Sequence, residues 1–187
     1  HCFVTIHDKV MVYDEEFKKL DEFGNRYLGD CHETWVDNNQ LLISSTAYDS
    51  VLTFDITKGA FVHGICFRNQ LDRIINKALW KTIGIKRTAN LAARSFDPNA
   101  DDGPREKDEL HINNVTVQSG VIHVSSHRAK WLYAVNGDRL ERVARLPFKT
   151  HNARLFRDGV IFSNTGNSEV TYIGLDGQVR HNYPAIH

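Results

Sequence analysis

An internal repeat constrains the fold of this chain more than any other feature of the sequence. Four segments each begin with a histidine and continue with a short apolar run, a polar turn and a second apolar run. They are HCFVTIHDKVMVY from His1, HETWVDNNQLLISS from His32, HINNVTVQSGVIHVSS from His111 and HNARLFRDGVIFSN from His151. Counted from the histidine, the second run starts after 9, 9, 10 and 9 residues. The segments therefore align to within one residue.

The apolar runs have the character of β-strands. They are short, they are rich in Val, Ile, Tyr, Phe, Trp and Thr, and several alternate apolar with polar residues. A third run follows in three segments, as SVLTFD, KWLYAVNG and EVTYIGLDG. Units of three or four antiparallel strands, repeated about every 40 residues, are typical of propeller blades. The sequence therefore predicts an all-β fold, a β-propeller with about four blades, in which residues 1–187 form a single domain and part of a larger ring.

An insertion over residues 70–109 interrupts the repeat. Its first part places apolar residues at helical spacing, which predicts a short amphipathic helix; they are Leu71, Ile74, Ile75, Ala78 and Leu79. Its last part, Asp97 to Glu109, is predominantly acidic and predicts a surface loop.

The segments FDPNADDGPREKDELHINNVTVQSGVIHVSS and THNARLFRDGVIFSNT carry a resemblance to a protein family. They resemble a group of poorly characterised bacterial β-propeller proteins, six-bladed in type, in which LHxN and HN elements open successive blades. The resemblance covers Phe96 to Gly177 well and the earlier segments more loosely. It implies a fold, and it implies no established activity.

The histidines that open the repeats are the main candidates for a functional site. The innermost strand of each propeller blade lines the central channel, so residues at the start of that strand are expected to form a ring. The candidates for this ring, and for metal ligands, are His1, His32, His111 and His151. Neutral imidazoles that converge in this way can bind a divalent transition metal such as iron, manganese or zinc. Two alternatives are that these histidines bond to blade-edge backbone groups and structural water, or that they, His32, His111 and His151 in particular, contact a ligand or substrate directly.

Residues beside the ring histidines are candidates for contact with a ligand. Asn113 and Asn152 can donate and accept hydrogen bonds, and Glu33 can act as a general base or as a further metal ligand. The remaining internal histidines are expected to be surface or packing residues; they are His7, His63, His123, His127 and His181.

Composition narrows the classes of partner and compartment. The formal net charge is zero, so the chain as a whole offers no electrostatic attraction to nucleic acid or to an anionic membrane. No apolar run reaches the roughly 20 residues that span a bilayer. The three cysteines have no disulfide or zinc-ribbon spacing, which favours a reducing, cytoplasmic compartment.

Two functions fit these features. The first is a ligand-binding or scaffold propeller that uses the channel mouth, lined by the repeat histidines, to hold a small molecule, a glycan or a protein. The second is a metal-dependent enzyme, lyase-like or oxygenase-like. At the level of architecture only, it resembles propeller enzymes that hold a metal on axial histidines, such as carotenoid oxygenases and some polysaccharide lyases.

Overall fold

The computed structural model describes residues 1–69 and 91–185, and over these ranges the chain is built from β-strands and one short 3-10 turn, Thr46–Tyr48. The helix that the sequence predicts at residues 71–79 lies outside the described residues. Residues 91–96, in the second half of the predicted insertion, form a strand. The described part of the chain has no helix with the length and apolar character needed to cross a membrane.

The strands form four antiparallel blades. Blade I contains β1 (Cys2–Ile6), β2 (Lys9–Tyr13) and β3 (Lys19–Gly24). Blade II contains β4 (Cys31–Asp37), β5 (Gln40–Ser45), β6 (Ser50–Asp55) and β7 (Ala60–Asn69). Blade III contains β9 (Ile112–Gln118), β10 (Val121–Ser126), β11 (Trp131–Asn136) and β12 (Arg139–Arg145). Blade IV contains β13 (Thr150–Phe156), β14 (Gly159–Asn164), β15 (Glu169–Gly174) and β16 (Val179–Pro184).

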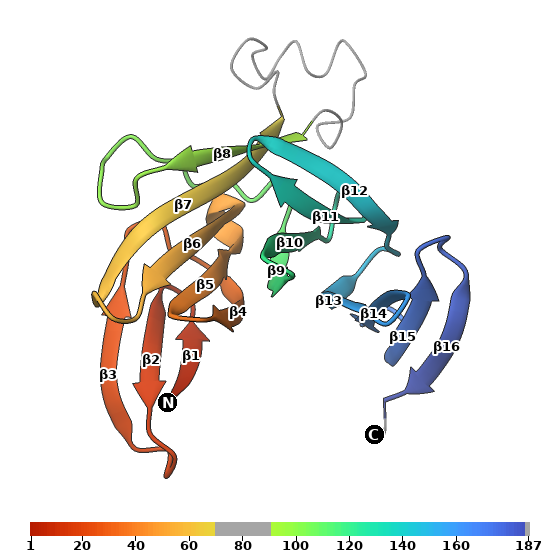
Figure 1. The fold of residues 1–187 in the computed structure, drawn as a ribbon, viewed down its shortest axis with the longest axis horizontal. Helices are drawn as coiled ribbons and strands as arrows, with labels where there is room; N and C mark the ends of the chain where they lie inside the picture. Colours follow the sequence, from red (N-terminus) through yellow and green to blue (C-terminus); the bar gives the residue numbers. More distant parts are fainter. Residues whose placement is uncertain (70–90, 186–187) are drawn as a thin grey trace.

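The blades follow one another around an arc, with the first strand of each on the inner side and the last on the outer side (Figure 1). The inner strand β4 contacts β1 and β9, and β9 contacts β13. Strand β8 (Leu91–Phe96) pairs with β7 along its length and with β12 at a single pair, Ala92 and Arg139. It therefore links blades II and III into one 9-stranded sheet. The β-propeller fold expected from the repeat is confirmed.

Each blade uses the same two backbone turns. The hairpin between its first and second strands begins with a residue at positive φ; these residues are His7, Asn38, Ser119 and Arg157, with φ of 48°, 52°, 51° and 53°. Such turns match the right-handed twist of the strands they connect. The turn between the second and third strands has another such residue near its end. Asp49, Lys130 and Ser168 directly precede the third strand, and Phe17 lies two residues before it. The repeat is therefore a repeat of backbone conformation as well as of apolar runs.

The hydrophobic core lies between neighbouring blades. Val10 of blade I packs with Leu41 and Leu52 of blade II, in a cluster that joins the first two blades. A second cluster joins blades II and III, and a third joins blades III and IV around Phe162 and Leu132. Each blade is thus stabilised chiefly by its neighbours, as expected for a fold built from repeated sheets.

Replacement of Phe162 by Ala tests this inter-blade packing. Phe162 is 2% exposed, so Phe162→Ala should lower the free energy of unfolding by about 3–5 kcal/mol, through lost burial and a residual cavity. Urea denaturation followed by circular dichroism measures the change. The same replacement at Phe17, which is 75% exposed, should change stability by no more than about 0.5 kcal/mol. Equal effects at the two positions would contradict the assigned core.

Candidate functional site

Three of the predicted histidines lie together on the inner side of the arc. His32 is the second residue of β4, His111 directly precedes β9, and His151 is the second residue of β13. One ring nitrogen from each lies within 4.8 Å of the others. The ring centroid of His32 lies 5.1 Å from that of His111 and 6.1 Å from that of His151. In the described ranges no other group of three or more His, Cys, Asp or Glu residues has the proximity that a shared metal ion needs.

Each of the three imidazoles has a hydrogen-bonding partner at Nδ1. In His32, Nδ1 lies 2.9 Å from the carbonyl oxygen of Asp30 and 3.0 Å from Oγ1 of Thr46. The Thr46 hydroxyl donates to the carbonyl of Ile112 on β9, so it is free to accept from the imidazole. A proton on Nδ1 of His32 therefore satisfies both neighbours and leaves Nε2 with a lone pair.

His111 and His151 show the same arrangement. In His111, Nδ1 lies 3.1 Å from the carboxylate of Asp108. In His151, Nδ1 lies 3.4 Å from Oγ1 of Thr165, whose hydroxyl donates to a backbone carbonyl. Partners of this kind, at the nitrogen remote from a metal, orient histidine ligands in metal sites and fix their tautomer.

The three histidines do not occupy equivalent positions in their blades, which corrects the alignment made from the sequence. In the strand pairing, Cys31, Ile112 and Thr150 lie opposite Ser45, Ser126 and Asn164. The residues that follow Cys31, Ile112 and Thr150 are His32, Asn113 and His151. Asn113, and not His111, is thus the counterpart of the other two histidines. His111 stands two positions earlier and reaches the cluster from outside the strand.

His111 has a left-handed backbone conformation, and blades II and IV each have a residue of the same conformation directly before their inner strand. Asp30, His111 and Lys149 have φ of 48°, 56° and 66°. The carbonyl oxygen of each accepts a hydrogen bond from the residue after the second strand, with N to O distances of 3.4, 3.1 and 3.2 Å. The three donors are Thr46, His127 and Thr165.

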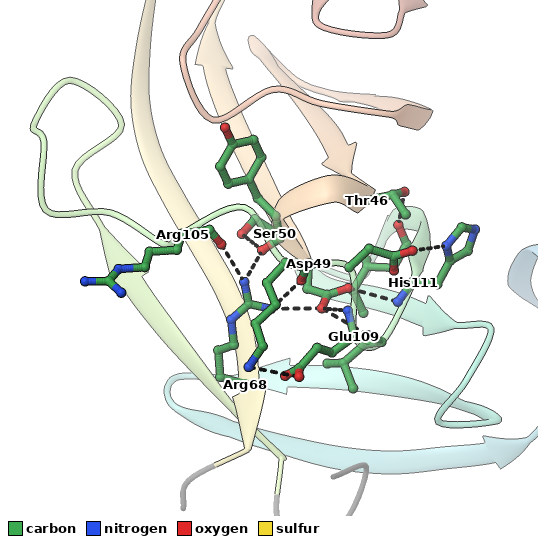
Figure 2. Close-up of polar contacts among 12 residues, drawn as sticks. Thr46, Asp49, Ser50, Arg68, Arg105, Glu109 and His111 are labelled. Carbon is green, nitrogen blue, oxygen red and sulfur yellow. Dashed lines mark hydrogen bonds and ion pairs between the residues drawn. The ribbon is translucent and has the colours of Figure 1, made fainter. Parts of the chain in front are cut away.

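The buried carboxylate of Asp49 fixes the main chain at His111 (Figure 2). Asp49 is 0% exposed. It accepts hydrogen bonds from the backbone N–H groups of Glu109, Leu110 and His111, over 2.8, 3.0 and 2.9 Å. These bonds order the segment before β9 against the turn of blade II that contains Asp49.

Arg68 on β7 balances the charge of Asp49. Its guanidinium lies 2.8 Å from the Asp49 carboxylate and also donates to the backbone carbonyls of Tyr48, Arg105 and Lys107 (Figure 2). Burial raises the pKa of Asp49 to about 6, while the N–H of Leu110 and the charge of Arg68 oppose this rise. The three backbone N–H donors and the guanidinium of Arg68 all favour the ionised form of the carboxylate.

His127 lies beside the three converging histidines, although the alignment of the repeats on their first histidine did not select it. Its ring centroid lies 5.4 Å from that of His111 and 5.8 Å from that of His151. The prediction that His127 is a surface or packing residue did not include these contacts with the other histidine rings. The sequence does contain a signal: in SST, SSH and SNT the first two residues end a second strand, and the last residue directly follows it. These last residues are Thr46, His127 and Thr165. A comparison of these positions would have placed His127 beside the ring histidines.

The local environment favours the neutral form of His127 and of His151. The pKa of His151 is lowered, chiefly by burial and also by the charges of His32 and His111, although a hydrogen bond to Lys149 opposes the shift. Burial likewise lowers the pKa of His127, with His111 and His151 adding to the effect. Neutral imidazole is the form that binds metal ions.

The other predicted site residues have different surroundings. The amide of Asn113 is buried: it donates to the carbonyl of Thr150 and accepts from Ser125, so it joins blade III to blade IV. Asn152 is exposed and has φ of 54°. Glu33 is partly buried, and burial raises the pKa of its carboxyl against the lowering effect of Arg154. A role for these three in ligand binding or catalysis stays a prediction.

His1 is exposed and lies outside the group of converging nitrogens. The histidines expected in packing or surface positions have contacts of that kind: His123 is buried and bonds to the carbonyl of Val121, and His63 bonds to Ser95. His181 stacks on Tyr172.

Comparison with known proteins identifies the fold. No protein-family model and no curated protein matches the chain. Among solved structures, a streptogramin B lyase matches with a TM-score of 0.54 and 13% identity, over 97% of this chain and 50% of that chain. A catalytically inactive variant of virginiamycin B lyase from Staphylococcus aureus, with quinupristin, matches with a TM-score of 0.51 and 10% identity, over 94% of this chain and 48% of that one.

A protein of unknown function from Bacteroides caccae also matches, with a TM-score of 0.51 and 8% identity, over 95% of this chain and 69% of that chain. The chain spans about half the length of the two lyases. At these identities the likeness shows the β-propeller fold alone. The narrower resemblance to bacterial propellers with LHxN and HN elements stays a prediction.

Replacement of Asp49 by Asn tests whether this residue holds the start of β9. Asp49→Asn removes the charge that faces Arg68 and places an amide NH2 against backbone donors, so the free energy of unfolding should fall by about 3 kcal/mol or more. The backbone amide signals of Glu109, Leu110 and His111 should shift in 15N NMR spectra.

The matched control is Asp176→Asn, which removes an exposed ion pair with Arg180 and should cost less than about 1 kcal/mol. If Asp49→Asn is no more destabilising than this control and leaves the amides of residues 109–111 in place, the assigned role is wrong.

Proposed function

We propose that this chain is a ligand-binding part of a β-propeller that holds a divalent transition metal on His32, His111 and His151, with the metal as the anchor for the ligand. The observation that carries the proposal is the convergence of three ring nitrogens within 4.8 Å, from imidazoles that each engage a neighbour at Nδ1. Three neutral histidines are a common protein ligand set for zinc and related metals.

The cluster needs only a small contraction to bind a metal. Zinc binds imidazole nitrogen at about 2.0–2.1 Å, so the donor atoms of a tetrahedral site lie about 3.3 Å apart. The separations of up to 4.8 Å in the structure can close by rotation of the side chains. His32 is exposed and the other two are partly buried, which leaves the side nearest His32 accessible.

A metal held by three protein ligands keeps a coordination position for water or for an oxygen or nitrogen donor of a ligand. We therefore favour a small molecule with such a donor group as the ligand. A glycan could bind in the same way through its hydroxyl groups. A protein partner, which the sequence also allows, and iron or manganese in place of zinc stay predictions.

A metal-dependent enzyme, lyase-like or oxygenase-like, is the second candidate, and Glu33 is the observation that favours it. Glu33 follows His32 directly, it is partly buried, and burial raises the pKa of its carboxyl, as suits a general base. Its carboxylate is not among the converging ligand atoms. A Glu33→Gln variant tests this second function. If the variant and the original chain bind the metal and its ligand equally well, and neither chain converts the ligand into a product, the binding function stays in place.

Zinc titration of the metal-free chain tests the proposal. Isothermal calorimetry should show one zinc per chain, and His32→Ala, His111→Ala and His151→Ala should each weaken binding by more than about 100-fold, because loss of even an outer-shell partner commonly costs 10–100-fold. His63→Ala removes a histidine outside the cluster and should leave the affinity unchanged. Zinc binding that survives all three cluster replacements in chains that still fold, or no zinc binding by the original chain, would refute the proposal.

A further inference from the structure

A pocket of about 540 Å³ lies between blades III and IV. Its lining comes from the end of β12 and the two residues after it, and from the face of blade IV that packs against blade III. No histidine of the cluster lines it. Pockets that bind small molecules commonly have volumes of about 300–1,000 Å³. This one therefore has the size of a small-molecule site.

The pocket lies in the outer part of the interface between the two blades. Inner strand β13 contacts β9 and β10, whereas the outer strands β12 and β16 diverge from each other (Figure 1). At the other two interfaces the outer part is filled. Between blades II and III, strand β8 pairs with both β7 and β12. Between blades I and II, the rings of Phe23, Phe54 and Phe61 pack together.

The lining of the pocket includes a buried hydroxyl without a hydrogen-bond partner. Thr171 on β15 lines the pocket and is 3% exposed, and its Oγ1 makes no hydrogen bond to any described residue. This state is unfavourable, because a buried hydroxyl has lost its hydrogen bonds to bulk water. A ligand in the pocket that carries a donor or an acceptor would restore one of them.

Blade IV differs from blades II and III at the position of Thr171. The equivalent residues are Leu52 and Tyr133, since each lies on the third strand, opposite the residue two places before the end of the second strand. Leu52 and Tyr133 are 0% and 3% exposed and belong to the apolar clusters between blades. The residue that fills the core in those blades is thus a threonine that lines a pocket in blade IV.

Other polar side chains around the pocket are available to a ligand. They are Asn164 at the end of β14, Arg145 at the end of β12, and Asn182, which lies opposite Thr171 on β16. Within residues 1–69 and 91–185, none of these three side chains has a hydrogen bond or an ion pair. Each amide can donate and accept hydrogen bonds, and the guanidinium can donate them.

The charges of the lining favour a neutral ligand. The charged side chains that line the pocket are Arg145, Glu169 and Asp176. Asp176 forms an ion pair with Arg180, and one carboxylate oxygen of Glu169 accepts from the amide of Asn167 over 2.8 Å. Because the lining has no excess of positive charge, it does not attract a phosphate or a sulfate group. The carboxylates can instead accept hydrogen bonds from hydroxyl groups.

The lining also has apolar surface. Pro147 and Val179 are exposed side chains of the lining, and Phe162 and Ile173 join the pocket to the core between the blades. A sugar ring combines C–H groups with hydroxyl groups that both donate and accept hydrogen bonds. Its C–H groups suit the apolar surface, and its hydroxyl groups suit the amides, the carboxylates and the unpartnered threonine.

We propose that the pocket between blades III and IV binds a neutral carbohydrate, a mono- or disaccharide, through hydrogen bonds from its hydroxyl groups to Thr171, Asn164 and Asn182. This site is separate from the metal-binding function proposed above, because the two share no residue. The chain thus has two places for ligands, one at the inner ends of the blades and one between two blades.

NMR titration of the 15N-labelled, metal-free chain with single sugars tests the inference. The probes are glucose, galactose, mannose, N-acetylglucosamine, maltose and cellobiose. At least one should cause saturable shifts of the backbone amide of Thr171 and of the side-chain NH2 signals of Asn164 and Asn182. Thr171→Val keeps the shape of the side chain and removes its hydroxyl, so it should weaken binding by about 10-fold, as the loss of one hydrogen bond commonly does. Asn182→Ala, on an exposed strand, should have a similar effect.

Two controls separate this site from the rest of the molecule. Thr53→Val removes a hydroxyl from the third strand of blade II, where Thr53 is 5% exposed, and His151→Ala removes a ligand of the proposed metal site. Both variants should bind the sugar as the original chain does, and thermal melting establishes that each variant is folded. If no probe shifts the pocket signals, or if Thr171→Val and Asn182→Ala leave the sugar affinity unchanged, the pocket holds only water and the inference is wrong. Neither result affects the metal-binding function, since the titration contains no metal.

Discussion

The contact between Asp49 and the segment before β9 is the interaction on which the candidate site depends. A fully buried carboxylate of blade II accepts three consecutive backbone N–H groups at the start of blade III, and Arg68 neutralises its charge from β7. Apolar packing brings the two blades together, but it does not define where the chain turns into the inner strand. The directional bonds to Asp49 do so, and they place His111 where its ring meets His32.

The fold could be predicted from the sequence because a propeller repeats both its apolar runs and its turns. Apolar runs at matching distances from a histidine were enough to identify strands, blades and the inner end of each blade. The convergence of His32, His111 and His151 was also predictable from this architecture, since inner strands of successive blades approach one another. The predicted helix at residues 71–79 lies outside the described part of the chain.

The details of the site could not be predicted, because they depend on backbone conformation. An alignment anchored on the letter His makes His111 equivalent to His32, whereas the strand pairing makes Asn113 its equivalent. His111 occupies the left-handed position that Asp30 and Lys149 occupy in the neighbouring blades, and these residue types share no obvious sequence signature. His127 was missed for a related reason: its counterparts, Thr46 and Thr165, are hydroxyl residues. The match between SST, SSH and SNT aligns the three positions, but a hydroxyl residue does not by itself indicate a place beside an imidazole, which the contacts of Thr46 and Thr165 with the histidines show.

The chemistry of the proposed site follows from burial and from fixed tautomers. Burial lowers the pKa of His127 and of His151, and neighbours at Nδ1 of three rings leave Nε2 with a lone pair. The ring nitrogens of the site are thus suited to bind a positive ion without a change of tautomer. Anomalous diffraction from crystals of the zinc-loaded chain would test the central claim most directly. The account predicts one strong peak about 2.0–2.1 Å from ring nitrogens of His32, His111 and His151. A peak bound to other residues at full zinc occupancy, with these three rings unliganded, would contradict it.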